Sequence, residues 1–368
     1  MKGGNNMEIR HLTVAELELA IQLSDKTFRN ELQVSMGKAF PLVFSSNSNL
    51  AFGAFDKEKL VCFFGLVPFR LKIGPAYVDA FSIGSVCTDP EYRGKGIASK
   101  ILAKINDFTK DAGASLLLVS GDRGLYTRNG CIPVGKSYTY HITKHGTTTK
   151  DEGDIRRGTN ADLMRVYALS QQTYVRYESS INEWKTLLDA GGYASIFNLR
   201  QSIFVSELNG EITGYVVVGL QDKSDLKQPS IITEWGGDSK SIFSIIMGIL
   251  EEKEVGALKI KVPWHDALTE TLVDYLVEEG SIGGTVRVIH PERLVEQIMP
   301  YLASEDPAIR SKLKVQWNKD GTVGLKYDGE SWLLPEAEFS NMLFNPKDNL
   351  LPTLLPIPLP STEGMYYV

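Results

Sequence analysis

The stretch that says most about the fold of this 368-residue chain is Val86-Cys-Thr-Asp-Pro-Glu-Tyr-Arg-Gly-Lys-Gly-Ile-Ala98. A strand-like stretch over 79–88 leads into Pro90, and a glycine-bearing turn and a helical pattern follow. Such a turn presents free backbone N–H groups at the positive end of a helix, where the donors and the dipole both stabilise an anion. Gly94 and Gly96 let the backbone approach a phosphate that a Cβ would hold away. The segment therefore predicts a phosphate-binding turn.

Two common phosphate-binding motifs do not fit this turn. The dinucleotide-binding pattern G-x-G-x-x-G needs a third glycine where Ser99 stands, and a P-loop needs Gly-Lys-Ser/Thr at a spacing that is absent here. A glycine-rich turn with a purely structural role remains the alternative.

The order Pro90, Arg93, Gly96 and Ala98 after a strand closely resembles the acetyl-CoA pyrophosphate motif of the GNAT superfamily of N-acetyltransferases. The resemblance implies acetyl-CoA as co-substrate and no metal. It also implies a bulge in the strand, which would free a backbone N–H near Cys87 for an oxyanion. The implied CoA-binding residues are Val86, Cys87 and Thr88 along the pantetheine arm and Arg93, Gly94, Lys95, Gly96, Ile97 and Ala98 at the pyrophosphate.

Composition excludes several other classes of protein. Hydrophobic residues make up 43 % and charged residues 23 %, the balance of a soluble globular protein, and the net charge of −6 argues against a nucleic-acid binder. The longest apolar runs are too short to span a membrane, so no membrane partner is expected. Three scattered cysteines, Cys62, Cys87 and Cys131, predict neither disulfides nor a zinc site. We expect a cytoplasmic protein.

The pattern of elements predicts an α/β (α+β) chain of three domains. Residues 1–145 contain strands, the motif strand and its helix, a buried strand at 115–120 and a closing strand at 138–143. After a polar linker, 150–282 repeats this order, with a hairpin at Asn209-Gly210 and a helix expected at 267–279. Its equivalent turn carries Asp238, which would fill the N–H groups of the next helix. This half therefore predicts a degenerate copy without a CoA site, and an unrelated α/β domain is the alternative.

Residues 283–368 predict a small α+β unit with hairpin turns at Asp320-Gly321 and Asp328-Gly329. A tail rich in proline and leucine ends at Val368. Two tandem acetyltransferase-like domains and a small third one resemble the enhanced-intracellular-survival (Eis) branch of the superfamily, whose third domain is sterol-carrier-like. That branch acetylates primary amines of aminoglycosides or lysine side chains and forms multimers, which implies a homo-oligomer with one active site per chain.

Two residues are candidates for proton transfer. Tyr126, in Gly124-Leu-Tyr-Thr-Arg-Asn-Gly130, matches the tyrosine of the second family motif and could protonate the leaving thiolate, although Cys131 stands where the family usually has an aromatic residue. The Eis-like branch uses its C-terminal carboxylate as general base, which implies that Val368 has this role. The alternatives are a core tyrosine and a tail that merely closes the third domain.

The sequence thus predicts an acetyl-CoA-dependent N-acetyltransferase that acts on a small-molecule or peptide primary amine (aminoglycoside-like, polyamine or lysine-type) by direct attack in a ternary complex. The alternative from another class is a catalytically inactive CoA-binding regulatory or scaffold protein. Cys87 and Cys131 are expected to be buried thiols and not nucleophiles, because no histidine is adjacent to either in the sequence and direct attack needs no acyl-enzyme.

Overall fold

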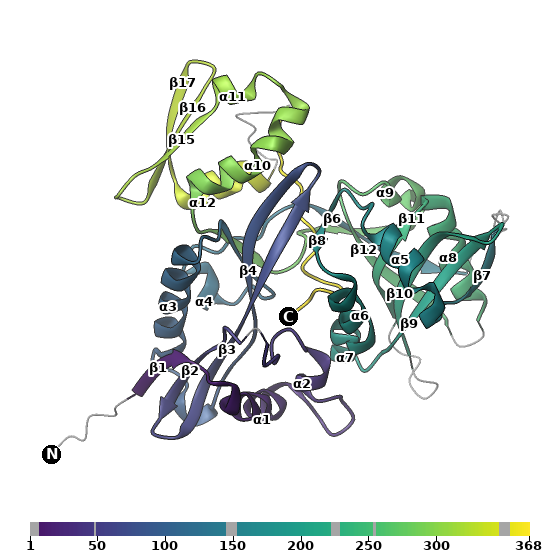
Figure 1. The fold of residues 1–368 in the computed structure, drawn as a ribbon, viewed down its shortest axis with the longest axis horizontal. Coiled ribbons are helices and arrows are strands. Elements are labelled where there is room, and N and C mark those ends of the chain that lie inside the picture. Colours follow the sequence, from purple (N-terminus) through teal and green to yellow (C-terminus); the bar gives the residue numbers. More distant parts are fainter. Residues whose placement is uncertain (1–6, 48, 145–152, 222–228, 253–254, 346–353) are drawn as a thin grey trace.

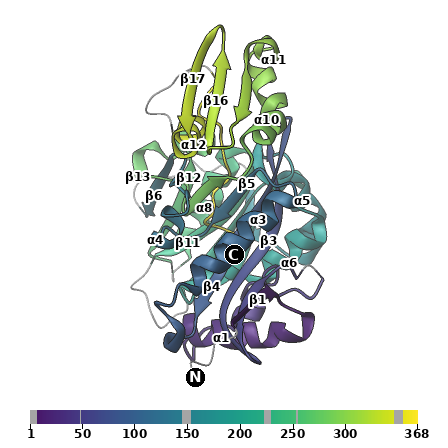
Figure 2. The same cartoon turned by 90° about the vertical axis from the view of Figure 1, so that its left-hand side faces the viewer.

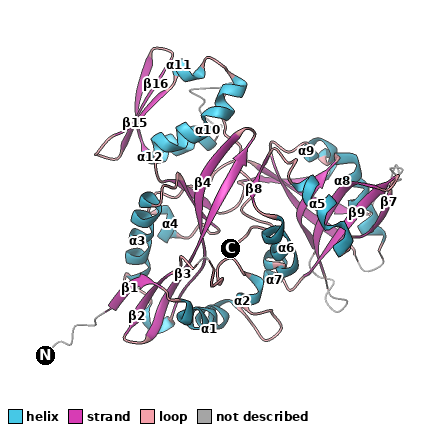
Figure 3. Cartoon of the chain, viewed as in Figure 1, coloured by secondary structure: helices cyan, strands magenta, loops and turns pink. Residues whose placement is uncertain are grey.

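The structure is a computed structural model that describes residues 7–47, 49–144, 153–221, 229–252, 255–345 and 354–368. Within these residues the strands form two seven-stranded sheets and one three-stranded sheet (Figures 1 and 3). The mixed α/β architecture expected from the sequence is confirmed.

The first sheet has the strand order β1-β2-β3-β4-β5-β14, and β8 pairs with β3. Its strands are β1 (Met7–His11), β2 (Phe52–Asp56), β3 (Lys59–Ile73), β4 (Ala76–Thr88), β5 (Leu116–Val119), β8 (Val175–Glu178) and β14 (Thr285–Val288). All four residues of β5 are buried, as expected for a strand covered on both faces. β4 and β5 are parallel, and their pairing ends at Ile83 and Val119 although β4 continues to Thr88. The two strands therefore part at the end that leads to the glycine turn.

Helices cover both faces of this sheet. They are η1 (Val14–Glu16), α1 (Leu17–Phe28), α2 (Met36–Ala39), η2 (Pro90–Tyr92), α3 (Ile97–Asp111) and α4 (Gly124–Thr127). α3 buries Ile97, Ile101 and Ile105 in one hydrophobic cluster, whereas α1 packs Ala20 into another. The helical spacing of these residues explains how a single face of each helix reaches the sheet.

The second sheet has the order β13-β6-β12-β11-β10-β9-β7. Its strands are β6 (Ser137–Thr143), β7 (Asp154–Arg157), β9 (Arg200–Leu208), β10 (Glu211–Leu220), β11 (Ser230–Gly237), β12 (Ala257–Pro263) and β13 (Leu276–Gly280). The helices around it are η3 (Asn160–Asp162), α5 (Leu163–Ser170), α6 (Ile181–Ala190), α7 (Gly192–Ile196), α8 (Ser239–Glu251), α9 (Leu268–Thr271) and η4 (Val273–Tyr275). The hairpin at Asn209-Gly210 is confirmed, with φ of 52° and 83° at its two central residues.

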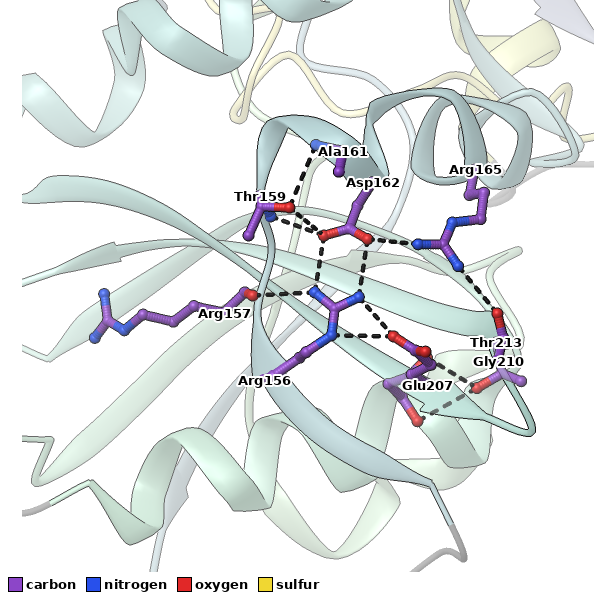
Figure 4. A network of polar contacts seen from close by, with 10 residues as sticks. Arg156, Arg157, Thr159, Ala161, Asp162, Arg165, Glu207, Gly210 and Thr213 are labelled. Atoms are coloured by element: carbon purple, nitrogen blue, oxygen red, sulfur yellow. Dashed lines mark hydrogen bonds and ion pairs between the residues drawn. The ribbon is translucent and has the colours of Figure 1, made fainter.

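A charged network ties the beginning of this second unit together (Figure 4). Arg156 on β7 donates to Asp162 Oδ2 at 2.8 Å and to Glu207 Oε2 at 2.6 Å, and Arg165 on α5 donates to Asp162 Oδ1 at 2.8 Å. Hydrogen bonds from Arg156 hold the pKa of the Asp162 carboxyl well below its usual range. The network links β7, β9 and α5.

Two sequence expectations need correction. The strand at 138–143 exists as β6, but it pairs with β12 and β13, whereas β14 takes the place beside β5. Tyr140 and Ile142 of β6 are buried in the core of the second sheet, which explains the choice of partner. The helix expected over 267–279 ends at Thr271, because the chain from Leu276 forms a strand that covers the edge of β6.

The third unit is a three-stranded antiparallel sheet with helices beside it (Figure 2). Its elements are α10 (Pro291–Glu305), α11 (Ile309–Lys312), β15 (Lys314–Trp317), β16 (Thr322–Tyr327), β17 (Glu330–Pro335) and α12 (Glu336–Phe344). Both turns expected from the sequence join neighbouring strands here.

The described part of the tail, residues 354–368, runs back from the third unit into the body of the molecule, and Figure 1 shows its end near the centre. Its buried side chains include Leu354, Leu355, Ile357, Leu359, Met365, Tyr366 and Val368. The expectation of a packed tail is confirmed for these residues.

Candidate active site

The glycine turn lies at the exposed beginning of α3. Gly94 and Gly96 have φ of 74° and 72°, a region that favours glycine, and a Cβ added to either would meet no atom within 4 Å. Gly96 is the N-cap of α3 and provides no side chain, and the first turn of the helix holds no acidic residue. No side chain caps the first N–H groups of α3, which fits the phosphates of a CoA molecule.

The equivalent helix of the second unit is closed to such a ligand. Asp238 caps α8 and accepts hydrogen bonds from the backbone N–H groups of Lys240 and Ser241, both at 3.0 Å. Its carboxylate occupies the donors that a phosphate would use and repels a second anion. The expected difference between the two halves is thus present in the structure.

The strand that leads to the turn contains the bulge implied by the family resemblance. Phe63 pairs with Cys87 and Gly65 pairs with Gly84, so that β4 carries one more residue than β3 in this interval. Ser85 lies in this interval with a φ of 52°. Because a bulge interrupts the ladder of hydrogen bonds, backbone groups become available beside Cys87.

A cavity of about 220 Å³ opens where β4 and β5 part. One wall comes from β4 and β5, a second from α4 and the residues before it, and a third from the chain between α1 and α2. Tyr367 and Val368 complete the lining, together with Ile196 of α7 in the second unit.

The last residue of the sequence lies in the gap between the two strands. Ser120, which directly follows β5, donates from Oγ to the Val368 main-chain oxygen at 2.8 Å. On the opposite side, a Cβ built on Gly84 of β4 would lie 2.1 Å from the Val368 carbonyl carbon. The terminus therefore contacts β4 directly at Gly84, where the absence of a side chain leaves room for it.

Residues that precede Val368 are held mainly by the second unit and by β8. Lys261 on β12 forms an ion pair with Glu363 at 2.9 Å, and His265 Nε2 lies 3.2 Å from the Leu359 carbonyl oxygen. The hydroxyl of Tyr366 hydrogen-bonds with that of Ser179 at 2.7 Å. These contacts fix the path of the tail up to Tyr366, whereas Ser120 and Gly84 of the first unit contact Val368 itself.

Tyr126 lines the same cavity. It lies on α4, is 5 % exposed, and points its ring toward Gly121, whose added Cβ would be 3.7 Å from Tyr126 Cε2. Burial raises the pKa of its hydroxyl well above the usual value, with a smaller opposing effect of Arg123. The hydroxyl therefore keeps its proton at neutral pH and can donate it.

The cysteines are buried thiols, as expected. Burial raises the pKa of Cys62 and of Cys131 to about 11 and that of Cys87 to about 12. All three remain protonated at neutral pH, which disfavours a role as nucleophile.

Several residues of the cavity escape sequence reasoning. Gly84 and Ser120 are recognised only through their contact with Val368, and Arg29 and Arg123 bring two cationic side chains to the lining. No motif marks these residues, and an arginine after an amphipathic helix carries no distinctive signal in sequence.

Known proteins resemble this chain in a family model and in the fold. A family model described as an acetyltransferase (GNAT) domain matches residues 8–134. A search of curated protein sequences found no match. Within the described residues, no helix is long and apolar enough to cross a membrane.

Solved structures share the fold over most of the chain. A probable N-acyltransferase from Enterococcus faecalis is 14 % identical and has a TM-score of 0.66, over 90 % of this chain and 85 % of that one. A GCN5-related N-acetyltransferase from Anabaena variabilis is 12 % identical and has a TM-score of 0.64, over 93 % of this chain and 92 % of that one. Eis1 from Mycobacterium abscessus is 14 % identical and has a TM-score of 0.60, over 89 % of this chain and 84 % of that one. Residues 8–134 thus match the model of an acetyltransferase (GNAT) domain, and the chain shares its fold with these solved structures.

Proposed function

We propose that the chain transfers the acetyl group of acetyl-CoA to a primary amine by direct attack in a ternary complex. One observation carries the proposal: the main chain of Val368 and the side chain of Tyr126 line a single cavity where β4 and β5 part. The proposed proton acceptor and the proposed proton donor thus line the same cavity, beside the strand that leads to the glycine turn.

The residues at the turn and on β4 fit the co-substrate. The uncapped N–H groups of α3 and the open space at Gly94 and Gly96 suit a pyrophosphate, with Arg93 and Lys95 exposed beside it. Backbone groups of Val86, Cys87 and Thr88 would pair with the pantetheine arm in the opening that β5 leaves. Ile97 and Ala98 supply the first N–H groups of the helix.

Two protons move in the proposed reaction. The Val368 carboxylate accepts the proton that the amine gives up, and a carboxylate with a reference pKa near about 3.5 needs burial or a relaying water for this role. The amine nitrogen bonds to the acetyl carbon, the C–S bond breaks, and Tyr126 donates its proton to the departing thiolate. A backbone N–H of the bulge near Cys87 stabilises the charge on the carbonyl oxygen.

The whole chain is proposed to follow the Eis-type plan, with an amine acceptor of the aminoglycoside, polyamine or lysine class. Its domains would be a catalytic one over 1–145, a degenerate one over 150–282 and a sterol-carrier-like one over 283–368. β6 of the first range lies in the second sheet, and β14 of the third range lies in the first sheet, so these domains share strands. A cytoplasmic homo-oligomer remains part of the proposal.

Release of free thiol from acetyl-CoA, measured with a panel of primary amines, tests the proposal. Gly96→Ala should raise the Kd for CoA by roughly tenfold, because a side chain at positive φ distorts the turn and intrudes on the phosphate. Gly210→Ala is the matched control, since Gly210 also has positive φ and open space but lies in the hairpin of the second unit. Tight CoA binding without thiol release for any amine would favour a regulatory CoA-binding protein instead.

A further inference from the structure

We propose that the acceptor amine carries an anionic group, a carboxylate or a phosphate, which is bound by Arg29 and Arg123. This inference rests on the proposed acetyl transfer and specifies the class of its acceptor.

The charged side chains that line the cavity are positive, and the terminal carboxylate is negative. Among the described residues, Arg29 and Arg123 are the charged side chains that line it, and no aspartate or glutamate side chain does so. The carboxylate of Val368 is the one anion, and the proposed reaction assigns it to the amine proton. An acceptor with several positive charges would find no acidic side chain to pair with in this lining.

Arg29 is half-buried and lacks a carboxylate partner among the described residues. Its guanidinium donates to the Ser195 carbonyl oxygen at 3.3 Å and to Ser195 Oγ at 3.1 Å, while its Nε is buried without a hydrogen-bond partner. Burial lowers the pKa of Arg29, and the charge of Asp25 opposes this effect. Asp25 itself accepts hydrogen bonds from Ser35 Oγ at 2.7 Å and from the Met36 N–H at 2.6 Å.

A cation that is partly removed from water, with a donor unused, is stabilised by an anion that forms charged hydrogen bonds. The planar guanidinium matches a carboxylate or a phosphate in two-pronged geometry, which an ammonium group cannot do. Ser195, on α7 of the second unit, holds Arg29 toward the cavity. The second unit thereby contributes to acceptor binding although its own helix N-terminus is closed.

Arg123 also lines the cavity, at the beginning of α4. It is exposed, forms no ion pair with a described residue, and lies close enough to Tyr126 and Tyr367 to influence the pKa of both hydroxyls. Two arginines in the lining of one cavity can bind one anionic group of an acceptor. Their charges also disfavour the protonated form of a nearby amine, and the neutral form is the nucleophile.

The size of the cavity fits a small acceptor. Its volume of about 220 Å³ lies below the roughly 300–1,000 Å³ of sites for drug-sized ligands. An amine and an anion within one molecule of amino-acid size satisfy both the volume and the charges.

The test compares acceptors that differ only in the anionic group. L-Lysine is compared with cadaverine for the carboxylate arm, and O-phosphoethanolamine with ethanolamine for the phosphate arm. The anionic member of at least one pair should have a kcat/KM roughly tenfold to a hundredfold higher, the range that charged hydrogen bonds supply. The arm with the larger ratio identifies the anion.

Arg29→Gln should remove most of this preference, and Arg29→Lys should retain part of it, because the charge remains without the planar fork. Arg123→Gln, at an exposed position, gives a second variant in which loss of folding is not expected. Arg128→Gln is the matched control, since Arg128 is exposed on the same segment but does not line the cavity. Equal rates within both pairs, a preference for the cationic members, or an equal ratio in Arg29→Gln would overturn the inference.

Calorimetric titration of the CoA-loaded protein with the same four amines separates this inference from the proposed reaction. Arg29-dependent binding of an anionic amine without thiol release would support the acceptor class and reject the transfer. Thiol release at the same rate with and without the anionic group would support the transfer and reject the proposed acceptor class.

Discussion

Gly84→Ala should displace the terminus from the active site. The added Cβ would lie 2.1 Å from the Val368 carbonyl carbon, 2.4 Å from its oxygen and 3.0 Å from its Cβ. Because ordinary contacts begin near 3.4 Å, the terminus has to move by more than about 1 Å, and a shift of that size can reduce a catalysed rate by roughly 100-fold. The φ of Gly84 is not positive, so the backbone itself tolerates alanine.

Steady-state thiol release, with acetyl-CoA and the best amine both varied, measures the effect of this substitution. We expect kcat to fall by roughly 100-fold, with a small change in Tm. Gly121→Ala is the matched control in the same cavity, because its Cβ would be at an ordinary 3.7 Å from the nearest described atom. A Gly84→Ala enzyme with the kcat of the parent, or an equal loss in Gly121→Ala, would refute the reasoning.

Three further predictions concern single side chains. Tyr126→Phe should lower kcat by roughly 100-fold without loss of folding, because it removes the proton donor; an unchanged kcat would reject this role. Asp238→Ala should lower the free energy of unfolding by about 1 kcal/mol through loss of the cap of α8, measured in urea, and an unchanged midpoint would contradict the capping role. Burial raises the pKa of Glu234 from 4.5 to about 8. Between these values the folded protein keeps a proton that the unfolded chain releases, so stability falls as pH rises, by up to about 1.4 kcal/mol per pH unit. Glu234→Gln should flatten this slope in urea unfolding between pH 5 and pH 8.5, and an identical slope would show that Glu234 does not titrate as described.

Several features of the first two units could be predicted from the sequence, because local patterns determine them. The turn at Gly94 and Gly96, the hairpin at Asn209-Gly210 and the cap at Asp238 each depend on residues close in sequence. The sheets that β6 and β14 join do not depend on nearby residues. A short alternating strand can pair with several open sheet edges, and only the packing of the completed core selects one of these edges.

In the candidate site, too, some residues could be predicted from nearby sequence, and others are recognised only from contacts between distant parts of the chain. Tyr126 belongs to a local motif, and Val368 is suggested by the apolar tail and by a family resemblance. The contact of Ser120 with Val368 joins residues 248 positions apart, and Arg29 meets Ser195 across 166 positions. Such contacts depend on how the units pack, which hydrophobic periodicity does not reveal.

A semisynthetic protein whose Val368 ends in a carboxamide tests the central claim most directly. The carboxamide keeps the size of the terminus and its hydrogen bond from Ser120 but cannot accept the amine proton. We expect kcat for acetyl transfer to fall by roughly 100-fold or more, while Tm and the Kd for CoA stay the same as in the carboxylate form. A carboxamide protein with the full kcat would show that the Val368 carboxylate is not the general base.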